Sequence, residues 1–380
     1  MSNHPAPSFR FDLREVNGAL GDIGTLLPLT IGVIALVGMS SQHVLMGFGL
    51  FYIASGLIYR LPIPVQPMKA IAAVALATEI TPGAIALSGL FMGATLLILG
   101  GSGVIDRVAR LVPQSVLSGL QLGLGLSLGW IALGLMQDQM IIGALSLVLA
   151  IAALRWGVHA ALVTIFVGVA LGHVLGDPGL AYGPVSNMGG WIPQIPQFAD
   201  IRMAITDLAI PQLALTLTNA VFLTALVAHD SFGKRAAHVT PRKLCLTSGA
   251  ANLLLAPFGA LPMCHGAGGV TAHHRFGART GGAPIMLGLG LLILVVLPED
   301  LRRSALSSIP AATLGALLLI ASVELAFSRR LIDAKPSCRP VIGVTAIATV
   351  FVNPLAGLIA GTIAEILRKF LLSRSIFPYR

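Results

Sequence analysis

The sequence predicts an all-α polytopic membrane protein of about fourteen transmembrane segments, arranged as a seven-plus-seven inverted repeat with two half-helices. Three observations predict this fold class. Hydrophobic residues make up 56% of the 380 residues and charged residues only 10%, against roughly 25% charged in soluble domains. Apolar stretches close to the roughly 20 residues of a membrane span recur along the chain. Two similar Pro-Met stretches, at 64–69 and 261–266, each interrupt an apolar stretch.

The membrane segments can be placed in order from the apolar runs between charged loops. In the first half we expect segments near 16–38, 42–60, 62–78, 82–101, 113–136, 139–154 and 158–175. In the second half we expect segments near 204–228, 241–258, 260–276, 282–298, 306–327, 339–352 and 354–371. Several of these are below the roughly 20 residues of a full span, so we expect some to be short or broken.

The basic residues support both the number of segments and their orientation. The chain has 24 lysines and arginines and a formal net charge of +9. If the N-terminus is cytoplasmic, the predicted segments place all but four of these basic residues on the cytoplasmic side. Lys69 lies within a segment, and Arg202, Arg302 and Arg303 lie on the external side. Cytoplasmic loops carry an excess of Lys and Arg. We therefore expect a multi-pass protein of the cytoplasmic (inner) membrane with both termini in the cytoplasm, and no nucleic-acid partner.

The two halves of the chain resemble each other at a common shift. Pro67 matches Pro262 at a shift of 195 residues, and Asp12 matches Asp207 at the same shift. Seven segments per half is an odd number, so the second half would cross the membrane in the opposite sense to the first. We expect a first repeat over 1–175, an external linker rich in Gly and Pro over 176–203, and a second repeat over 204–380.

The Pro-Met stretches are the first candidate for a binding site. We expect each proline to open a helix that begins partway across the membrane, after a short extended piece at 62–65 or 259–261. A helix N-terminus presents unpaired N–H groups and about half a positive charge, so two facing N-termini can hold an anion. The candidate binding residues at these two starts are Gln66, Pro67, Met68, Lys69, Met263, Cys264, His265 and Gly266.

Two charged residues inside predicted segments extend this hypothesis. Lys69 comes directly after the first Pro-Met pair, and an intramembrane lysine is a functional hypothesis by default. Asp22 lies in a Gly-rich first segment, where the glycines indicate a break or a close approach of helices. Asp22 is a candidate proton carrier or a partner for Lys69. The alternative is a purely structural ion pair.

Further polar residues are candidates for the walls of the same site. His265 can donate a hydrogen bond to an anion when neutral or carry a proton when charged, although a lone histidine is more often structural. Thr25 in the first segment and Asn219 in the eighth can line the cavity, the latter together with Gln212 and Thr216. The alternative for the hydroxyl groups is a hydrogen bond to the backbone of a neighbouring helix.

The remaining titratable residues favour structural interpretations. Glu324 and Glu365 are predicted near cytoplasmic ends of segments, where snorkelling or pairing with arginines suffices. The His-His-Arg group at 273–275 is interpreted as a cytoplasmic flank and not as a metal site. The three cysteines have no paired or metal-like spacing, so we expect neither a metal nor a cofactor.

The stretches GALGDIGTLLPL, PVQPMKAIAAVALA, PQLALTLTNAV and LPMCHGAGGVTAHHRFGARTGG resemble those of the molybdate transporter family, a short branch of the sulfate permease superfamily. The resemblance extends from about Phe11 to Arg368. It implies a core domain of segments one to four and eight to eleven, and a gate domain of segments five to seven and twelve to fourteen. It also implies molybdate transport, with sulfate as the close relative, and a homodimer contact through the gate. Sulfate permeases typically continue into a cytoplasmic regulatory domain, and the few residues after the last segment favour the molybdate branch.

Several functions remain open on this reasoning. The first is secondary active transport of a tetrahedral oxyanion, molybdate or alternatively sulfate, coupled to protons through Asp22 or His265. The second is a passive anion channel, which needs no proton carrier. An enzyme is disfavoured because the sequence shows neither paired catalytic carboxylates nor metal spacing. A nucleobase carrier is disfavoured because the second-half segments near the site hold no carboxylate.

Overall fold

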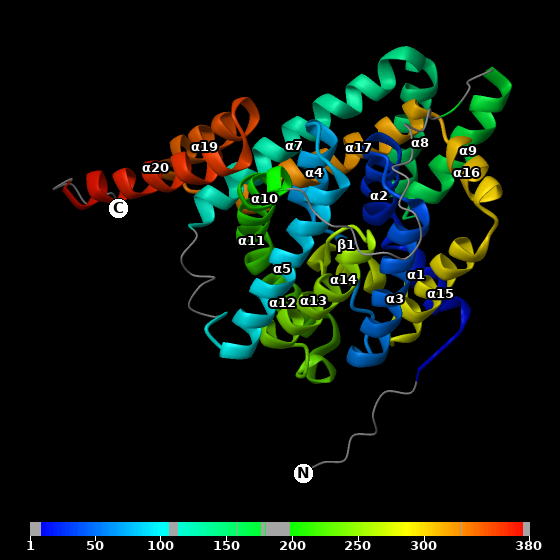
Figure 1. Ribbon diagram of the computed structural model, residues 1–380, viewed down its shortest axis with the longest axis horizontal. Coiled ribbons are helices and arrows are strands. Elements are labelled where there is room, and N and C mark those ends of the chain that lie inside the picture. Colours follow the sequence, from blue (N-terminus) through cyan, green and yellow to red (C-terminus); the bar gives the residue numbers. More distant parts are fainter. Residues whose placement is uncertain are drawn as a thin grey trace, which may run out of the picture.

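Helices make up most of the described part of the chain. The computed structural model describes residues 9–105, 113–157, 159–175, 179, 198–327 and 329–374. Within these ranges, helices surround a single two-stranded sheet near the centre of the molecule (Figure 1). The predicted all-α class is therefore confirmed, with two very short strands in addition.

The first half contains one strand and a series of helices separated by short breaks. Its elements are α1 (Leu13–Leu20), α2 (Ile23–Val37), α3 (Ser41–Tyr59), β1 (Gln66–Pro67), α4 (Lys69–Ala77), α5 (Pro82–Ser102), α7 (Gln114–Met136), η1 (Gln137–Gln139), α8 (Met140–Trp156) and α9 (Ala160–Leu175). These bounds follow the predicted segments closely, except where a predicted segment is divided.

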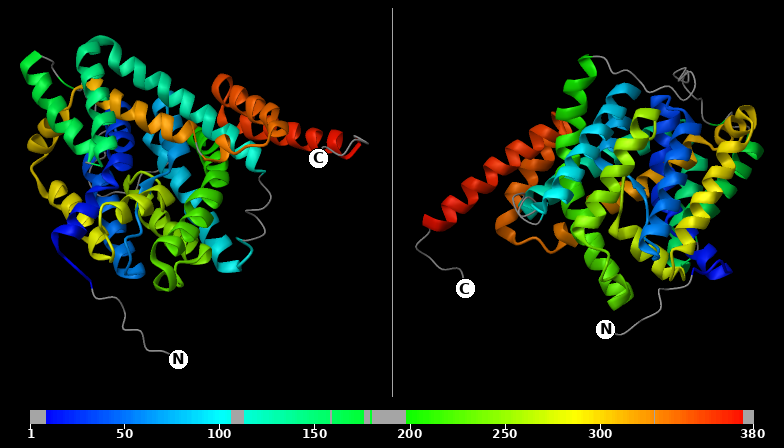
Figure 2. Two further views of the ribbon diagram at one scale, coloured as in Figure 1. Left: turned by 180° about the vertical axis from the view of Figure 1, so that it is seen from behind. Right: turned by 60° about the horizontal axis from the view of Figure 1, so that its bottom comes forward.

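The second half begins with a long helical stretch and ends with two helices that extend to one side of the molecule (Figures 1 and 2). Its elements are α10 (Phe198–Met203), η2 (Ala204–Ala209), α11 (Ile210–Leu215), η3 (Thr216–Leu223), α12 (Thr224–Phe232), η4 (Gly233–Ala236), α13 (Pro241–Leu255), η5 (Ala256–Phe258), β2 (Met263–Cys264), α14 (Ala267–Arg275), α15 (Gly282–Val296), α16 (Glu299–Ser307), α17 (Ala311–Ala326), α18 (Arg329–Ile332), η6 (Pro336–Cys338), α19 (Arg339–Phe351) and α20 (Pro354–Arg374).

The predicted first segment is divided into two helices at Gly21 and Asp22. Asp12 caps α1 by accepting two backbone N–H groups of the first turn, each at 3.0 Å. Gly18 allows a close approach to the loop after α14, because a Cβ at this position would lie 2.4 Å from the Ala278 side chain. Both features that the glycines indicated, a break and a close approach, are present. The break places Asp22 in the protein interior, fully shielded from solvent.

The eighth predicted segment also differs from a plain helix. Helical structure begins at α10, inside the predicted linker, most of which lies outside the described residues. Two of its pieces, η2 and η3, are π-helical, and such insertions are frequent at functional sites. Asp207 lies within η2, so it does not cap a helix as its sequence match Asp12 does.

The two half-helices begin later than predicted. Helix α4 starts at Lys69 and α14 at Ala267, whereas Pro67 lies in β1 and Pro262 just before β2. The prediction that each proline opens a helix is therefore wrong. The physical reason is that a proline also restricts the residue before it to extended backbone, which here suits a strand pair.

A short antiparallel ladder joins the two half-helices at their starts. Gln66 pairs with Cys264 and Pro67 pairs with Met263. The Met68 N–H extends the ladder by donating to the Pro262 carbonyl at 2.9 Å. The strands therefore lie at 66–67 and 263–264, a few residues beyond the predicted extended pieces. Because each half-helix follows its strand almost directly, the ladder brings the two N-termini to one place.

Helices of the two halves pack in reciprocal pairs. Helix α3 packs on α15, and α5 packs on α13. Helix α7 packs on α17 and α19, while α17 also packs on α8. Within each half, α8 pairs with α9 and α19 pairs with α20. Each pairing has a counterpart in which the halves exchange places, which is the pattern that an internal repeat produces.

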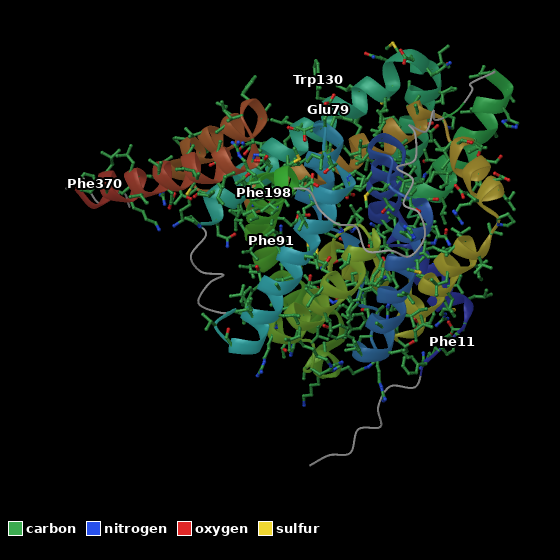
Figure 3. All side chains as sticks on the ribbon, in the orientation of Figure 1. Phe11, Glu79, Phe91, Trp130, Phe198 and Phe370 are labelled. Atoms are coloured by element: carbon green, nitrogen blue, oxygen red, sulfur yellow. The ribbon has the colours of Figure 1, made fainter. Side chains whose placement is uncertain are left out.

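Large apolar side chains cover the outside of the molecule. Trp130 is 79% exposed and Phe198 is 89% exposed. Figure 3 shows both at the periphery of the ribbon, together with Phe11, Phe91 and Phe370. Contiguous exposed apolar surface on this scale is unusual for a soluble monomer and suits contact with lipid. This surface supports the prediction of a membrane protein.

Several described helices are long and apolar enough to cross a membrane. They are Ser41–Tyr59, Pro82–Ser102, Gln114–Trp156 and Asp200–Ala236. A bent pair, Gly282–Val296 with Glu299–Ser307, turns by 119° and can form a fifth span. Shorter apolar helices lie at Leu26–Val37, Ala160–Leu175, Ala311–Ala326 and Pro336–Phe351. Because half-helices and divided helices cross a bilayer in pieces, these lengths do not fix the number of segments, and the count of fourteen stays a prediction.

Candidate functional site

The starts of the two half-helices open onto one cavity, which we call the central cavity. Its volume is about 170 Å³. The lining residues come from β1 and α4, from α11 and η3, from the β2–α14 connection, and from α7 and α17. They are Gln66, Pro67, Lys69, Gln121, Gln212, Leu215, Thr216, Asn219, Ala220, Leu223, Cys264, His265, Gly266, Ala267, Gly268, Glu324 and Leu325.

Backbone donors at the two helix starts are available to a ligand. At α14, the N–H groups of Ala267, Gly268 and Gly269 make no hydrogen bond to any residue that the structure describes. At α4, the Lys69 N–H is likewise unbonded within the described ranges. The next two N–H groups, of Ala70 and Ile71, donate to the Gln212 side-chain oxygen at 2.8 and 3.3 Å. An amide oxygen therefore already occupies part of the place where an anion would bind.

The Lys69 side chain brings a positive charge to this cavity. Lys69 is the first residue of α4 and is partly exposed. Within the described part of the chain, its ammonium group makes neither a hydrogen bond nor an ion pair, so Asp22 is not its partner. A lysine without a close partner, next to unbonded N–H groups, makes this end of the cavity attractive to anions.

Asp22 lies behind the cavity wall and not on it. Its Oδ1 accepts a hydrogen bond from Gln66 Nε2 at 2.5 Å, and its Oδ2 accepts one from the Tyr52 hydroxyl at 2.5 Å. His273 Nε2 lies 3.9 Å from Oδ2, and its Nδ1 donates to the Gly18 carbonyl at 2.8 Å. Asp22 therefore fixes the orientation of Gln66, whose side chain does reach the cavity.

His265 holds the β2–α14 connection in place. Its Nδ1 donates to the Pro64 carbonyl at 2.8 Å, so this nitrogen carries the proton. Its Nε2 then accepts from the Thr247 hydroxyl at 2.9 Å. The ring packs against Phe51 and Tyr59 and is only 1% exposed. Although His265 lines the cavity, both of its nitrogens already have protein partners.

The remaining predicted site residues are distributed as follows. Asn219 lies in η3 and lines the cavity, next to Thr216, which accepts a hydrogen bond from Gln212 Nε2 at 2.8 Å. Cys264 and Gly266 also line the cavity. Met68 and Met263 are fully buried and do not. The side chain of Thr25 lies outside the described residues.

The structure corrects two of the structural interpretations. His273 is not a cytoplasmic flank: it is completely buried and lies beside Asp22, although its neighbour Arg275 is exposed. Glu324, which was interpreted as a residue near a segment end, lines the central cavity. The available signal was its position inside an apolar segment, where any carboxylate is costly. Gln121, from α7, also lines the cavity and was missed because a single glutamine in a long apolar helix carries little signal.

Glu365 was predicted to pair with an arginine, and no metal site was expected. Arg368 donates to Glu365 with an N···O distance of 2.6 Å, which confirms an ion pair with a nearby arginine. Within the described ranges, His, Cys, Asp and Glu side chains form no group of three or more that could hold a metal ion. Cys245 and Cys264 are buried, unpaired thiols.

The fold and this cavity together define a class of protein, a membrane transporter built on two half-helices. The structure is similar to the transmembrane domain of BicA, a bicarbonate transporter of a cyanobacterium, with a TM-score of 0.72 and 15% identity over 93% of this chain and 98% of that one. It is also similar to the murine anion transporter Slc26a9, with a TM-score of 0.70 and 14% identity over 96% of this chain and 69% of that one. At such identities the likeness concerns the fold.

The family is given by the sequence comparisons. A family model described as "Molybdate transporter of MFS superfamily" matches residues 14–128 and 204–325. Molybdate transporters 2 and 1 of Arabidopsis thaliana are 29% and 30% identical to this chain, each over 93% of this chain and 87% of the relative. Molybdate transporter 1 of Chlamydomonas reinhardtii is 29% identical over 82% of this chain and 83% of the relative. The chain belongs to the molybdate transporter family, as the resemblance implied, and is an anion transporter and not an enzyme.

Proposed function

We propose that this protein carries molybdate across the cytoplasmic membrane by secondary active transport, and that the oxyanion binds between the starts of α4 and α14. One observation carries the proposal: two half-helix N-termini and Lys69 open onto a single cavity. Unbonded N–H groups and the positive ends of two helix dipoles favour a small anion at this place. The names of the relatives favour molybdate as its identity.

The side chains around these donors suit a tetrahedral oxyanion. Gln66, Gln121, Gln212 and Asn219 are amide residues among those that line the cavity. An amide group donates two hydrogen bonds, and an oxyanion can only accept them unless it is protonated. The Gln212 oxygen that now accepts from α4 would be replaced by an anion oxygen, which is a stronger acceptor because it is charged.

We propose further that the molecule works as two bodies. The core would comprise α1–α5 and α10–α15, and the gate would comprise α7–α9 and α16–α20, as the family resemblance implies. The central cavity lies between them, because α7 supplies Gln121 and α17 supplies Glu324 and Leu325, while the other lining residues come from the core. Movement of the core against the gate would expose the anion to each side in turn. A homodimer through the gate, and cytoplasmic termini, belong to the same proposal.

Calorimetric titration of the purified protein with molybdate, with sulfate as competitor, tests the site and the cargo together. We expect molybdate to bind and sulfate to displace it poorly. Lys69→Ala removes the charge beside the α4 N-terminus and is expected to weaken molybdate binding at least tenfold, about 1.4 kcal/mol. Lys369→Ala, at an exposed position on α20, is the matched control and should leave the affinity unchanged.

Each other outcome points to a different conclusion. Sulfate binding equal to or tighter than that of molybdate would make the protein a sulfate carrier with this fold. Unchanged affinity in the Lys69→Ala variant would move the site away from the half-helices. Absence of binding by either anion would overturn the proposed function. For the coupling, Asp22 and His265 are the candidates from the sequence, and loss of proton-coupled uptake in an Asp22→Asn variant with retained molybdate binding would assign the coupling to Asp22.

A further inference from the structure

Glu324 is a carboxylate at a cavity proposed for an anion. It lies near the end of α17, on the gate side, and its side chain lines the central cavity. Glu324 is exposed to solvent. It interacts electrostatically with Lys69, which approaches from α4 on the core side. Within the described residues the two groups are not close enough to form an ion pair.

The charges that face Glu324 are few. Lys69 of α4 is the cation among the described lining residues, and Cys264 and His265 are the other titratable groups on the cavity wall. The lining residues from α7, α11 and η3 are uncharged. The empty cavity therefore contains one positive and one negative charge when Glu324 is ionised. A dianion entering it would meet a like charge at short range, which opposes binding.

We propose that Glu324 is the proton-binding group of the transport cycle, so that one proton enters the cavity on this carboxylate together with each oxyanion. The inference rests on the proposed function and deepens it. The proton is taken from water onto a carboxylate oxygen, and no bond within the oxyanion is formed or broken. The neutral carboxyl group donates a hydrogen bond to an anion oxygen in place of repelling it. On the far side the anion and the proton leave together.

The placement of Glu324 also gives the empty carrier a neutral cavity. After release, the ionised carboxylate on α17 and the Lys69 ammonium on α4 attract each other across the boundary between gate and core. The empty cavity is then neutral without a bound anion, so the empty protein can change back to the state in which it takes up the anion. A bound dianion would leave the cavity with a net charge of about −2 without the proton and about −1 with it, and such charge is costly inside a membrane protein. The proton therefore lowers the net negative charge of the loaded cavity, and the positive ends of the two half-helices offset part of what remains.

The two earlier candidates are less suited to this role. Asp22 does not line the cavity, and its two oxygens already accept hydrogen bonds from the Tyr52 hydroxyl and the Gln66 amide. His265 uses both ring nitrogens for hydrogen bonds to Pro64 and Thr247. Glu324 makes no hydrogen bond within the described part of the chain, so its oxygens can serve a proton and an anion.

Titration calorimetry in buffers of different ionisation enthalpy tests this inference, because it counts the protons taken up with molybdate. For the wild-type protein we expect about one proton per anion near neutral pH, and an affinity that falls by about tenfold per pH unit over the range in which Glu324 titrates. Glu324→Gln keeps a neutral hydrogen-bonding group of similar shape. It should bind molybdate without proton uptake, and its affinity should change less than about twofold between about pH 6 and about pH 8.

The matched control is Glu79→Gln, at the other end of α4 and outside the central cavity, where Figure 3 shows the residue at the edge of the molecule. This variant should retain the proton uptake of the wild type. Binding of molybdate by the wild type without proton uptake overturns the inference, as does full proton uptake or complete loss of binding in a folded Glu324→Gln variant. In each of these three cases the wild type still binds molybdate in a way that depends on Lys69, so the proposed function is not affected. If the wild type binds neither oxyanion, the proposed function itself fails.

Discussion

At the scale of single residues, the interior around Asp22 shows how a charge can be held in a membrane protein without an ion pair to a lysine. The Tyr52 hydroxyl and the Gln66 amide donate to its two oxygens, and His273 approaches from α14. These donors belong to α3, β1 and α14, while Asp22 precedes α2. A single carboxylate therefore joins four elements of the core, and it places the Gln66 side chain at the cavity.

We predict that removal of the Tyr52 hydroxyl is more costly than removal of the Tyr59 hydroxyl. Both tyrosines are fully buried, but Tyr52 donates to a carboxylate whereas Tyr59 bonds the hydroxyl of Thr247 at 2.7 Å. Hydrogen bonds to charged groups contribute about 1.5–3 kcal/mol and neutral ones about 0.5–1.5 kcal/mol. Tyr52→Phe should therefore lower the thermal midpoint in detergent about twice as much as Tyr59→Phe. Equal shifts would contradict a stronger hydrogen bond at Tyr52 than at Tyr59.

The same scale explains the residues that sequence reasoning placed wrongly. A histidine in a run of three polar residues near a segment end resembles an exposed flank. One helical turn, however, points neighbouring side chains in different directions. His273 consequently faces Asp22 while Arg275 faces outward. Glu324 was placed near a membrane surface because it lies close to the end of its predicted segment, whereas in the fold it lines the cavity together with Gln121 of α7, on which α17 packs.

At the scale of elements, the half-helices depend on one close contact. A Cβ at Gly269 would lie 2.5 Å from Asp22 Oδ1, 2.6 Å from the Pro64 Cβ and 2.7 Å from Gln66 Nε2. Gly269 is in the first turn of α14, where it packs directly on the residues that precede α4. The absence of a side chain is what lets the second half-helix start so close to the first strand.

We predict that Gly269→Ala disrupts this contact, whereas Gly268→Ala is tolerated. A Cβ at Gly268 has no neighbour within 4 Å, so this variant is a matched control on the same turn of α14. Gly268→Ala should leave the thermal midpoint unchanged or slightly higher, because Ala favours a helix over Gly by about 1 kcal/mol. Gly269→Ala should lower the midpoint and weaken molybdate binding at least tenfold. Native stability and binding in this variant would show that the contact is not required.

At the scale of the whole molecule, the central cavity is assembled from both halves of the sequence and from both proposed bodies. Figure 1 shows α7 crossing the upper part of the molecule, next to α17, above the region of β1 and α14. The views in Figure 2 show α19 and α20 extending from the same side as the adjoining end of α7. The gate helices thus cover the half-helices on one side, so relative movement of the two bodies would change access to the cavity.

We predict that molybdate protects Cys264 from a small thiol reagent, because Cys264 lines the central cavity. A variant with Cys245→Ser and Cys338→Ser leaves Cys264 as the single cysteine of the three in the chain. Saturating molybdate should slow its modification by a methanethiosulfonate reagent at least fivefold, whereas chloride should not. A further Cys264→Ser change should abolish labelling. Modification at the same rate with and without molybdate would contradict a cargo site at this cavity.

The sequence by itself determined the class of the fold, the two unusual Pro-Met stretches and the family, because hydropathy and motif spacing are local properties of the chain. It also singled out Lys69, Gln66 and Asn219, which line the central cavity, since a lysine or a cluster of amides in an apolar segment is conspicuous without a structure. The starts of the half-helices were misplaced because β1 and β2 form only when residues 195 positions or more apart meet. A strand of two residues has no periodicity to detect.

Only the tertiary structure decided which charged groups share a space. The sequence left open a pair between Asp22 and Lys69, but the packing of α3, α14 and β1 places Tyr52, Gln66 and His273 next to Asp22 instead. The same packing leaves Lys69 facing Glu324 across the cavity. Side-chain neighbours in a membrane protein are set by which helix faces meet, and this depends on the reciprocal packing of two distant halves and not on any local pattern.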